Sequence, residues 1–378
     1  VLRGCTFDGV QAAILRDTRG AILRDLAVRR SPGAGIILGP GNRDVAVLAS
    51  DVTDGYGPGV LVMTGNRSIL LQDLTIRGGT GTSNYHAGIL VTDRRIYREI
   101  GTTDFLLADW HFPPVDPIVE RSSPTEVFLV SNTITGMRSS GIYLDGAYGA
   151  VVRGNEIAGN SKEGICLDNG TTASVVYGND IVGNGQRWGQ DDQVLDREAV
   201  LRFGRMADGT PTAKVPGISL DNAIYNIVIA NNVAGNYGSG IKFVRTAFFN
   251  LVGNNNIVDN NRGANDVHFF FGIELGGAVS DVPADGPQEL DFLPSQGNVI
   301  FGNTILGPHY AGIQFCPDCQ DNDVFDNMIV RPDHWGIEET RPGMANHFLN
   351  NFSLAPARNA RPNGPEGRVL IGGNIVHD

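Results

Sequence analysis

A short motif, Gly-Ile-x-Leu or a close variant of it, recurs along this chain of 378 residues. Neighbouring copies are often 22 to 24 residues apart. The copies begin at Gly35, Gly59, Gly88, Gly141, Gly164, Gly217, Gly240, Gly272, Gly312 and Gly336. Self-similarity at a fixed period is typical of stacked architectures, in which each repeat buries its apolar face against its neighbours. The repeat therefore predicts one elongated domain over residues 1–378 rather than several globular domains.

The residues between two copies of the motif are typical of short strands joined by turns. Between Asn155 and Asn179, apolar-alternating runs of three to five residues are bounded by Gly or Asn, which predicts about three strands per repeat. Successive repeats would pair in parallel at about 4.8 Å, with Val, Ile and Leu stacked inside the coil. Asparagines that precede an apolar pair would occupy the same turn in each coil and bond to the next coil. They are Asn132, Asn155, Asn179, Asn232, Asn255, Asn303 and Asn327.

The composition restricts the partners and the location of the protein. A formal net charge of -12 argues against nucleic-acid and anionic-membrane partners, because their phosphates would be repelled. It favours a neutral polysaccharide or oligosaccharide, or an acidic one bridged by a cation. The sequence contains no run of about 18 apolar residues that could span a membrane. The chain begins at Val1 inside a predicted strand, so we expect an incomplete N-terminus and a secreted or periplasmic protein whose export signal lies upstream.

The four cysteines do not form a disulfide framework for a chain of this length. Cys316 and Cys319 have the spacing of a redox motif or of half a metal site. A second cysteine pair that would complete four ligands is missing nearby. We therefore expect a local disulfide or two turn thiols at this position, and no metal site.

The pattern of Asn-x-Ile followed by Gly-Ile-x-Leu resembles the right-handed parallel β-helix proteins of the pectin-lyase-like superfamily. The resemblance extends from Val1 to about Gly373. It implies an all-β fold, namely a single-stranded right-handed parallel β-helix of about 11 coils with three loop insertions. It also implies a carbohydrate-active protein, from a set that includes polysaccharide hydrolases, pectate- and alginate-lyase-like enzymes, uronan epimerases, fructotransferases and phage tailspike glycanases.

The sequence lacks the motifs that distinguish several of these enzymes. It contains neither the Asp-Pro-His of the alginate epimerases nor the Gly-His-Gly of the polygalacturonases. Its Asp-Asp pair, Asp191 and Asp192, lies in an insertion. A shared fold does not by itself select a reaction, so the subfamily stays open.

Three insertions interrupt the repeat, at about residues 93–124, 185–216 and 276–296. The first two enlarge the interval between neighbouring motifs to 53 residues, which requires either a divergent coil with a loop or one long loop. Each interruption lies close to an end of a Gly-Ile-x-Leu strand, so we expect the insertions to wall one face of the coil. Trp110 and Trp188 fall in the first two insertions, where they would stack on a sugar ring or anchor their loops.

Strand geometry assigns the outward residues of the motif to rows. Side chains alternate between the two faces of a strand, so x and the residue after Leu point away from the core. The second position is occupied by Asp145, Asp168 and Asp221, whose Cα atoms would stand about 4.8 Å and 9.6 Å apart in register. Such close like charges require a bound cation, a raised pKa or a counter-charge, which Lys242 and Arg245 could supply. Alternatively, aspartates at strand ends cap turns by accepting hydrogen bonds from backbone amides.

We expect a glycoside hydrolase or transglycosidase that acts on a polysaccharide through two carboxyl groups. Retaining enzymes hold these groups about 5 Å apart and inverting enzymes about 6.5 to 9.5 Å apart, which adjacent and alternate coils would provide. The preferred pair is Asp168 with Asp221 or Glu163, one as general acid and the other as nucleophile or base. Asp145 would adjust their pKa values or bind a sugar hydroxyl. The expected substrate-binding residues are Tyr143, Lys242, Arg245, Glu274, His86, Trp110 and Trp188. This chemistry requires no cofactor.

Two alternatives remain open. In a polysaccharide lyase or uronan epimerase, the three aspartates would hold Ca²⁺ against a uronate carboxylate, and Lys242 or Arg245 would abstract a ring proton from the sugar. In a non-enzymatic glycan-binding or tailspike-like protein, the aspartates would only cap turns. Either a monomer or a homotrimer is expected, because trimers occur among the proteins that this chain resembles.

Overall fold

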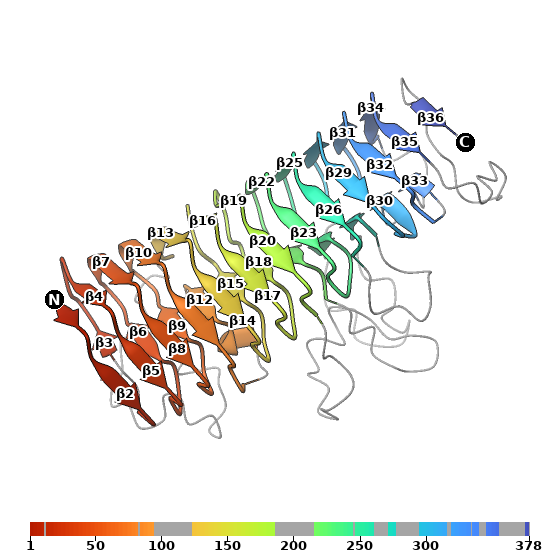
Figure 1. Ribbon diagram of the computed structural model, residues 1–378. Helices are drawn as coiled ribbons and strands as arrows, with labels where there is room; N and C mark the ends of the chain where they lie inside the picture. The colour runs from red at the N-terminus through yellow and green to blue at the C-terminus, as the bar shows by residue number, and fades with distance from the viewer. Residues whose placement is uncertain are drawn as a thin grey trace, which may run out of the picture.

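The chain winds into a stack of coils, with its two termini at opposite ends of the stack (Figure 1). The computed structural model describes residues 1–10, 13–81, 84–93, 123–185, 215–244, 246–260, 271–276, 295–315, 319–333, 335–339, 345–354 and 375–377. Within these residues, the helical structure consists of one 3₁₀ turn, η1 (Asn84–His86). No helix in the described part of the chain is both long enough and apolar enough to span a membrane.

Three parallel sheets run the length of the stack, and each coil passes through them in the order A, B, C. Sheet A consists of β1 (Leu2–Arg3), β4 (Ile22–Arg24), β7 (Arg43–Leu48), β10 (Arg67–Gln72), β13 (Thr125–Val130), β16 (Val151–Arg153), β19 (Val175–Tyr177), β22 (Ile227–Ile229), β25 (Leu251–Gly253), β28 (Val299–Phe301), β31 (Asp323–Phe325) and β34 (His347–Leu349). Sheet B consists of β2 (Thr6–Asp8), β5 (Ala27–Arg29), β8 (Asp51–Thr53), β11 (Thr75–Arg77), β14 (Thr133–Thr135), β17 (Glu156–Ala158), β20 (Asp180–Val182), β23 (Asn232–Ala234), β26 (Asn256–Val258), β29 (Thr304–Leu306), β32 (Met328–Val330), β35 (Phe352–Leu354) and β36 (Ile375–His377). Sheet C, which carries the Gly-Ile-x-Leu motif, consists of β3 (Ala13–Leu15), β6 (Ile36–Leu38), β9 (Val60–Val62), β12 (Ile89–Thr92), β15 (Ile142–Asp145), β18 (Ile165–Asp168), β21 (Ile218–Asp221), β24 (Ile241–Val244), β27 (Ile273–Leu275), β30 (Ala311–Phe315) and β33 (Trp335–Glu339).

Apolar side chains of the same kind stack directly above one another inside the coil. In sheet C, Ile142, Ile165, Ile218 and Ile241 are successive Cα partners, and all four side chains are 0% exposed. The three parallel sheets contain 12, 13 and 11 strands among the described residues, which confirms the predicted parallel β-helix. β12 pairs directly with both β9 and β15, so these three strands are consecutive neighbours in sheet C.

Most of the three predicted insertions lies outside the described residues, at 94–122, 186–214 and 277–294. The expected site residues Trp110, Trp188 and Arg245 lie outside them as well. These parts of the sequence interpretation therefore stay predictions.

Cys319 is a buried thiol at the corner that follows β30. Its Sγ donates to the backbone oxygens of Leu275 and Gly276, at 3.4 and 3.3 Å. Of the two states expected for the Cys-Pro-Asp-Cys segment, a disulfide or two turn thiols, the structure shows a thiol at Cys319. Cys316 lies outside the described residues.

The glycine of the motif is required by a close approach between coils. A Cβ atom at Gly164 would collide with Cγ2 of Ile181 and would lie 2.9 Å from the carbonyl oxygen of Gly217 in the next coil. Gly141 and Gly240 meet the same pair of obstacles, an isoleucine methyl group and a glycine carbonyl. The corner between sheets B and C is therefore too tight for a side chain at this position.

Gly164→Ala is expected to lower the free energy of unfolding by about 2 to 3 kcal/mol, because the added methyl group overpacks the corner. The control is Gly178→Asn, at a corner with a φ of +62° and no atom within 4 Å of an added Cβ. Asn254 occupies the equivalent corner of a later coil with a φ of 52°, so asparagine should be tolerated at position 178. Denaturant-induced unfolding of both variants measures the difference, and equal losses would contradict the steric account.

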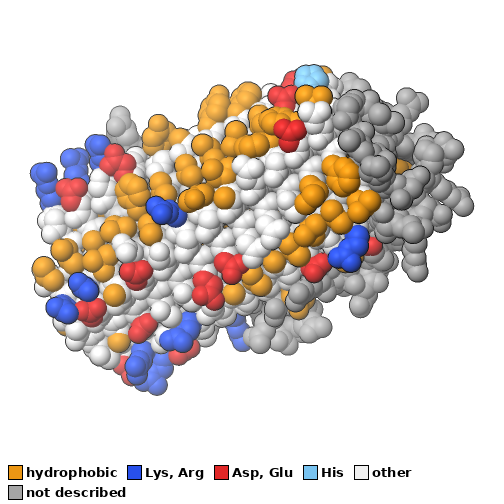
Figure 2. Space-filling view, turned by 45° about the horizontal axis from the view of Figure 1, so that its top comes forward, with side chains coloured by type: hydrophobic (Ala, Val, Ile, Leu, Met, Phe, Trp, Pro, Cys, Tyr) orange, Lys and Arg blue, Asp and Glu red, His pale blue; other side chains and the backbone are white. Residues whose placement is uncertain are grey.

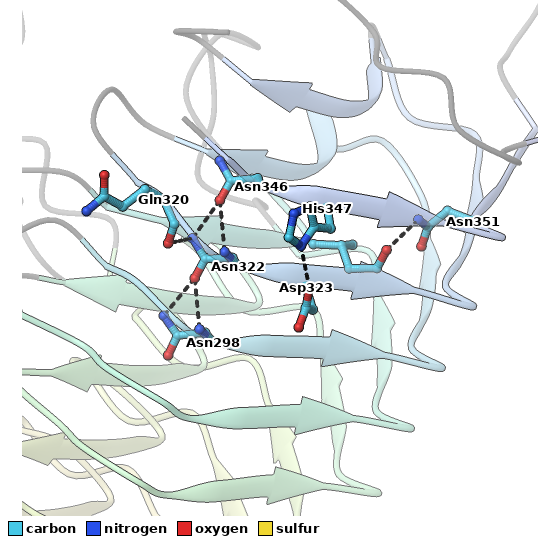
Figure 3. A network of polar contacts seen from close by, with 8 residues as sticks. Asn298, Gln320, Asn322, Asp323, Asn346, His347 and Asn351 are labelled. Atoms are coloured by element: carbon cyan, nitrogen blue, oxygen red, sulfur yellow. Dashed lines mark hydrogen bonds and ion pairs between the residues drawn. The ribbon is translucent and has the colours of Figure 1, made fainter. Parts of the chain in front are cut away.

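Asparagine ladders fix the corners of the coil. In each ladder, the backbone N–H and the side-chain amide of one asparagine donate to Oδ1 of the asparagine in the next coil, as Figure 3 shows for Asn298, Asn322 and Asn346. The ladder between sheets A and B comprises Asn132, Asn155, Asn179, Asn231, Asn255, Asn303, Asn327 and Asn351. The ladder before sheet A comprises Asn226, Asn250, Asn298, Asn322 and Asn346, and the ladder between sheets B and C comprises Asn160, Asn184, Asn236 and Asn260.

The expected structural role of the asparagines is confirmed, with one correction. Asn231 occupies the ladder, whereas the predicted Asn232 lies one residue later, on the outer face of sheet B. There its side chain donates to Asp180 Oδ1 at 2.7 Å. The alternation of strand side chains places only one of two consecutive asparagines at the corner.

Candidate active site

The strand register confirms the two predicted outward rows of sheet C. In the x row, each of the following residues is the Cα partner of the next: Leu90, Tyr143, Cys166, Ser219, Lys242, Glu274, Gln314 and Glu338. In the second row, Thr92 pairs with Asp145 and Asp145 with Asp168. Asp221 ends the next strand, β21, and pairs with Val244.

The outer face of sheet C is buried at the aspartates, which alternation along the strands did not predict. Asp145 and Asp168 are 0% exposed and Asp221 is 2% exposed. On the N-terminal half of the face, the x residues belong to a hydrophobic cluster separate from the core, which contains Ala34, Ile37, Leu61, Met63, Ala87, Leu90, Tyr143 and Cys166. A sequence signal for this burial exists, because strands with apolar residues at every position are typical of sheets covered on both faces.

Asp145 and Asp168 form the centre of a polar network that we call the aspartate cluster, comprising Thr92, Tyr143, Asp145, Asp168 and Asn169. The Thr92 hydroxyl donates to Asp145 Oδ2 at 2.7 Å. The Tyr143 hydroxyl donates to Asp168 Oδ2 at 2.5 Å. A buried carboxylate is costly unless donors surround it, and each of these carboxylates accepts at least two hydrogen bonds.

Asn169 joins the two carboxylates. Its side-chain amide donates to Asp145 Oδ1, and its backbone N–H donates to Asp168 Oδ1 at 2.7 Å. The residue adopts a left-handed backbone conformation with a φ of 51°, which asparagine tolerates better than most residues. This conformation turns the side chain back towards the preceding coil. The sequence analysis did not predict this bridge.

The hydrogen bonds distinguish Asp145 from a simple turn cap. Asp168 accepts a backbone N–H from the following residue, as a capping aspartate does, but its other oxygen accepts the Tyr143 hydroxyl. Both donors described for Asp145 are side chains from neighbouring coils. The cluster therefore links three adjacent strands, β12, β15 and β18. An aspartate that only caps a turn needs no such contacts with other strands.

Glu163 lies at the other end of its strand from the aspartate cluster. It precedes Gly164 and Asp168 follows Leu167, a separation of about 16 Å along an extended chain. The Glu163 side chain is 1% exposed and accepts the Ser140 hydroxyl at 2.7 Å. This separation exceeds the spacing of a glycosidase pair, so Glu163 is not the partner of Asp168.

Lys242 and Glu274 form an ion pair in the x row, on the C-terminal side of the aspartates. Lys242 Nζ lies 2.6 Å from Glu274 Oε1, and the Ser239 hydroxyl donates to Glu274 Oε2 at 2.7 Å. The side chains of Lys242 and Glu274 are 22% and 10% exposed. The expected counter-charge for the aspartates thus has a carboxylate partner of its own in the adjacent strand.

The polar part of the x row continues towards the C-terminus. Gln314 Nε2 donates to Glu338 Oε2 at 3.1 Å. Desolvation raises the pKa of Glu338 despite this hydrogen bond. Desolvation also raises the pKa of Tyr310, to which the nearby Glu338 charge contributes. The x row therefore changes along the stack from the apolar Leu90 to the charged and amide side chains of Lys242, Glu274 and Gln314. Among the described residues, no group of three or more His, Cys, Asp or Glu side chains is arranged to hold a metal ion.

His86 lies away from the aspartate cluster. It ends the turn η1 before β12, whereas Thr92 lies at the other end of that strand. The ring is 3% exposed and lies 5.0 Å from the Tyr56 ring, centroid to centroid. Its position before the strand does not support the predicted contact with a substrate at the aspartates.

His309 is a buried histidine at the corner before β30. It is 1% exposed, and desolvation lowers its pKa from 6.5 to about 4. Between these two pH values the unfolded chain binds more protons than the folded chain. The contribution of His309 to stability is therefore complete above pH 6.5 and falls as the pH drops towards 4.

The free energy of unfolding is expected to fall by about 2 to 3 kcal/mol between neutral pH and pH 4.5, because His309 must stay neutral in the folded chain. Denaturant unfolding at both pH values should show a smaller loss in His309→Leu than in the exposed control His347→Gln.

Comparisons with known proteins agree with this architecture. A family model described as "Right handed beta helix region" matches residues 119–288. Similar solved structures include the A-module of the mannuronan C-5 epimerase AlgE4 from Azotobacter vinelandii, which is 16% identical with a TM-score of 0.58; the match covers 93% of this chain and 79% of that chain. A variant of the periplasmic alginate epimerase AlgG is 12% identical with a TM-score of 0.54, and the match covers 88% of this chain and 73% of that chain.

A third similar structure is the enzymatically active domain of tailspike protein 2 from bacteriophage CBA120. It is 13% identical with a TM-score of 0.51, and the match covers 85% of this chain but only 43% of that chain. A search of curated protein sequences finds no match. At these identities the likeness shows the fold. Together with the three stacked sheets, these matches show that the chain folds as a right-handed parallel β-helix.

Proposed function

We propose that this protein is a carbohydrate-active enzyme that cleaves a polysaccharide at the outer face of sheet C, as a glycoside hydrolase or transglycosidase. The observation that carries the proposal is the pairing of Asp145 and Asp168 on adjacent strands, joined by Asn169. Carboxyl groups on adjacent strands stand about 5 Å apart, which is the separation typical of retaining glycosidases. The two epimerases with a similar fold are named for polysaccharide substrates, mannuronan and alginate, which supports the same class of substrate.

The hydrogen bonds suggest a role for each carboxyl group. Asp168, oriented by the Tyr143 hydroxyl and the Asn169 amide, attacks the anomeric carbon and forms a glycosyl-enzyme bond. Asp145 gives its proton to the leaving oxygen and then accepts a proton from the water or sugar hydroxyl that releases the glycosyl group. We assign Asp221, which ends the next strand, to the binding of the neighbouring sugar unit. This assignment makes Asp145 the partner of Asp168, in place of the expected Asp221 or Glu163, because Asn169 joins Asp145 to Asp168.

The burial of both carboxyl groups has a consequence for this mechanism. Both side chains are 0% exposed, so a sugar reaches Asp145 and Asp168 only after the groups around them rearrange. Closing the site again excludes water, which strengthens the electrostatic interactions of the cluster with a developing oxocarbenium ion. We also propose a secreted or periplasmic location, where a polysaccharide of this kind would be encountered.

A panel of neutral and acidic polysaccharides tests the proposed reaction. The protein is incubated with each one, and reducing ends and unsaturated uronates are measured in parallel. New reducing ends without unsaturation, in the presence of EDTA, support a hydrolase. Unchanged polysaccharides throughout the panel would overturn the proposal and leave a glycan-binding or tailspike-like shaft.

A uronan epimerase or lyase is a second candidate, favoured by one contact. The Tyr143 phenol lies within hydrogen-bonding distance of the Asp168 carboxylate, so the two groups could relay a ring proton of a uronate. Lys242 is less suited to accept that proton, because its ammonium group is held in an ion pair with Glu274. If Ca²⁺ binds the uronate at the aspartates, EDTA should abolish the reaction, and unsaturated products or exchange of the ring proton with deuterated solvent should replace new reducing ends.

A further inference from the structure

The outer face of sheet C is accessible towards the C-terminal end of the stack. Near the aspartate cluster, the x residues Cys166 and Ser219 are each 1% exposed. On β30 and β33, the two C-terminal strands described for sheet C, the x residues Gln314 and Glu338 are partly exposed. Figure 1 shows both strands at the C-terminal end of the stack. They lie four and five strands beyond β18, or about 19 and 24 Å from Asp168 at about 4.8 Å per strand.

Two aromatic side chains border this accessible part of the face. Tyr310 lies at the corner before β30, Trp335 begins β33, and both side chains are partly exposed. The Tyr310 hydroxyl accepts a hydrogen bond from the Trp335 indole, and the nearby Glu338 charge acts on the same hydroxyl. The Tyr310 ring also packs edge-on against the buried Phe271, with ring centroids 6.0 Å apart at an interplanar angle of 83°. These contacts fix the ring, and ordered side chains lose little conformational entropy when a ligand binds.

These rings lie on the same side of sheet C as the x row. In earlier coils, the residue immediately before the motif glycine belongs to the outer hydrophobic cluster, as Ala34 and Ala87 do. Trp335 occupies the same position in its own coil. We therefore group the partly exposed side chains at this end of the face as the Tyr-Trp patch, defined by Tyr310, Gln314, Trp335 and Glu338.

The polar groups of the patch suit the hydroxyl groups of a sugar. Gln314 Nε2 donates to Glu338 Oε2 at 3.1 Å, and an amide beside a carboxyl group offers both donors and acceptors. A sugar ring has C–H groups on its faces, which pack against aromatic rings, and hydroxyl groups around its edge, which need donors and acceptors. Aromatic rings with a few placed polar groups are typical of sites for small ligands.

The charges on this face select against an acidic sugar. From β12 to β33, the described residues of the x row and the second row include one ammonium group, Lys242, and Glu274 Oε1 lies 2.6 Å from it. The same residues include five carboxyl groups, namely Asp145, Asp168, Asp221, Glu274 and Glu338. A uronan carries a carboxylate on every sugar unit and would be repelled along the face. Desolvation also raises the pKa of Glu338, so the patch itself disfavours negative charge.

The exposed aromatic rings beside sheet A lie among apolar residues instead. Figure 2, which brings the top of Figure 1 forward, shows hydrophobic side chains in a band along that side of the molecule. In the strands β16, β19, β22, β25 and β28, Arg153 is the single charged residue, and no side chain carries a carboxyl or amide group. Tyr225, which precedes β22 and is 60% exposed, therefore serves as a control for the loss of an aromatic ring.

We propose that the Tyr-Trp patch binds an uncharged sugar unit, and hence that the polysaccharide cleaved at the aspartates is a neutral one. The two rings pack against the C–H face of the sugar, and the Gln314 and Glu338 side chains bind its hydroxyl groups. The proposal rests on the proposed function, because it takes the polysaccharide that reacts at Asp168 to extend along sheet C.

Affinity electrophoresis tests the binding without depending on turnover. Protein that carries Asp168→Asn, which should leave the sugar chains intact, is run in native gels that contain dextran, galactomannan or a soluble β-glucan. Parallel gels contain alginate or polygalacturonate, with and without Ca²⁺. Retention is expected on at least one neutral polysaccharide and on neither uronan. Adding Trp335→Ala should weaken this retention about tenfold or more. Adding Gln314→Ala, which removes no ring, should weaken it several-fold, and adding Tyr225→Ala should not change it.

Thermal unfolding verifies that each variant keeps the fold. Retention on a uronan alone, retention on none of the polysaccharides, or undiminished retention in both patch variants would overturn the proposal. Reducing-end assays of the wild-type protein on the same polysaccharides keep this failure apart from a failure of the proposed reaction. New reducing ends with an unchanged KM in Trp335→Ala would leave the reaction intact and overturn the patch. Retention that depends on Trp335 without any new reducing ends would support the patch and overturn the reaction.

Discussion

Asp168→Asn is expected to lower turnover by about a thousandfold or more, because the variant keeps the shape of the carboxyl group but loses its nucleophilic charge. The fold should be retained, since the amide oxygen of the introduced side chain can still accept the hydrogen bond of the Asn169 backbone amide. Reducing-end formation on the polysaccharide that the panel identifies measures the loss. Tyr143→Phe removes only the hydroxyl that donates to Asp168 and should cost less, about ten- to hundredfold.

The matched control is Asp180→Asn, which changes an exposed aspartate of sheet B. Its turnover and its thermal unfolding should stay close to those of the wild type. A loss of turnover in Asp168→Asn together with a native unfolding midpoint supports a catalytic role. Full turnover in Asp168→Asn would rule that role out, and a large drop in stability without any activity in the wild type would indicate a structural polar network.

Asn231→Ala is expected to lower the free energy of unfolding by about 4 kcal/mol, because several buried groups lose their partners at once. The Asn231 side chain donates to Val176 O, Ile229 O and Asn255 Oδ1, at 3.0, 3.1 and 3.0 Å. Its Oδ1 accepts both the backbone N–H and the side-chain amide of Asn179, at 3.0 and 2.9 Å. Each buried donor or acceptor left without a partner costs about 1 to 3 kcal/mol, partly offset by relaxation and water.

The adjacent substitution Asn232→Ala is the control for the ladder. Asn232 bonds to Asp180 and Asn256 on the solvent side of sheet B, so its loss should cost less than about 1 kcal/mol. Denaturant unfolding compares the two variants under the same conditions. Similar losses at the two positions would show that the continuous ladder does not dominate the stability of this corner.

The periodic sequence predicted the coil well because each element of the motif has a local physical cause. The glycine avoids an isoleucine methyl group and a carbonyl oxygen in the next coil, while the isoleucine and leucine stack in the core. The same periodicity gave the register of the outward rows. It failed by one residue at Asn231 and Asn232, because a pair of identical residues does not show which of them reaches the corner.

The candidate site was predicted only in part. The residues along a strand show which side chains point outward, but they do not show whether other parts of the chain bury those side chains. The row of Asp145, Asp168 and Asp221 follows directly from the strand register, but the burial of these residues does not. The hydrogen bond of Tyr143 crosses from β15 to Asp168 at the end of β18. The bridge from Asn169 depends on a left-handed conformation at one residue. Such contacts depend on side-chain rotamers and local backbone angles, which the repeat pattern does not specify.

Product analysis by mass spectrometry in heavy-oxygen water tests the central proposal most directly, namely that Asp145 and Asp168 cleave a glycosidic bond. Wild-type protein and Asp168→Asn are incubated with the same polysaccharide, and the masses of the products are compared. The account predicts shortened chains from the wild type, with one heavy oxygen at each new reducing end, and intact chains from Asp168→Asn. Unsaturated products, or chains that are never shortened, would contradict it.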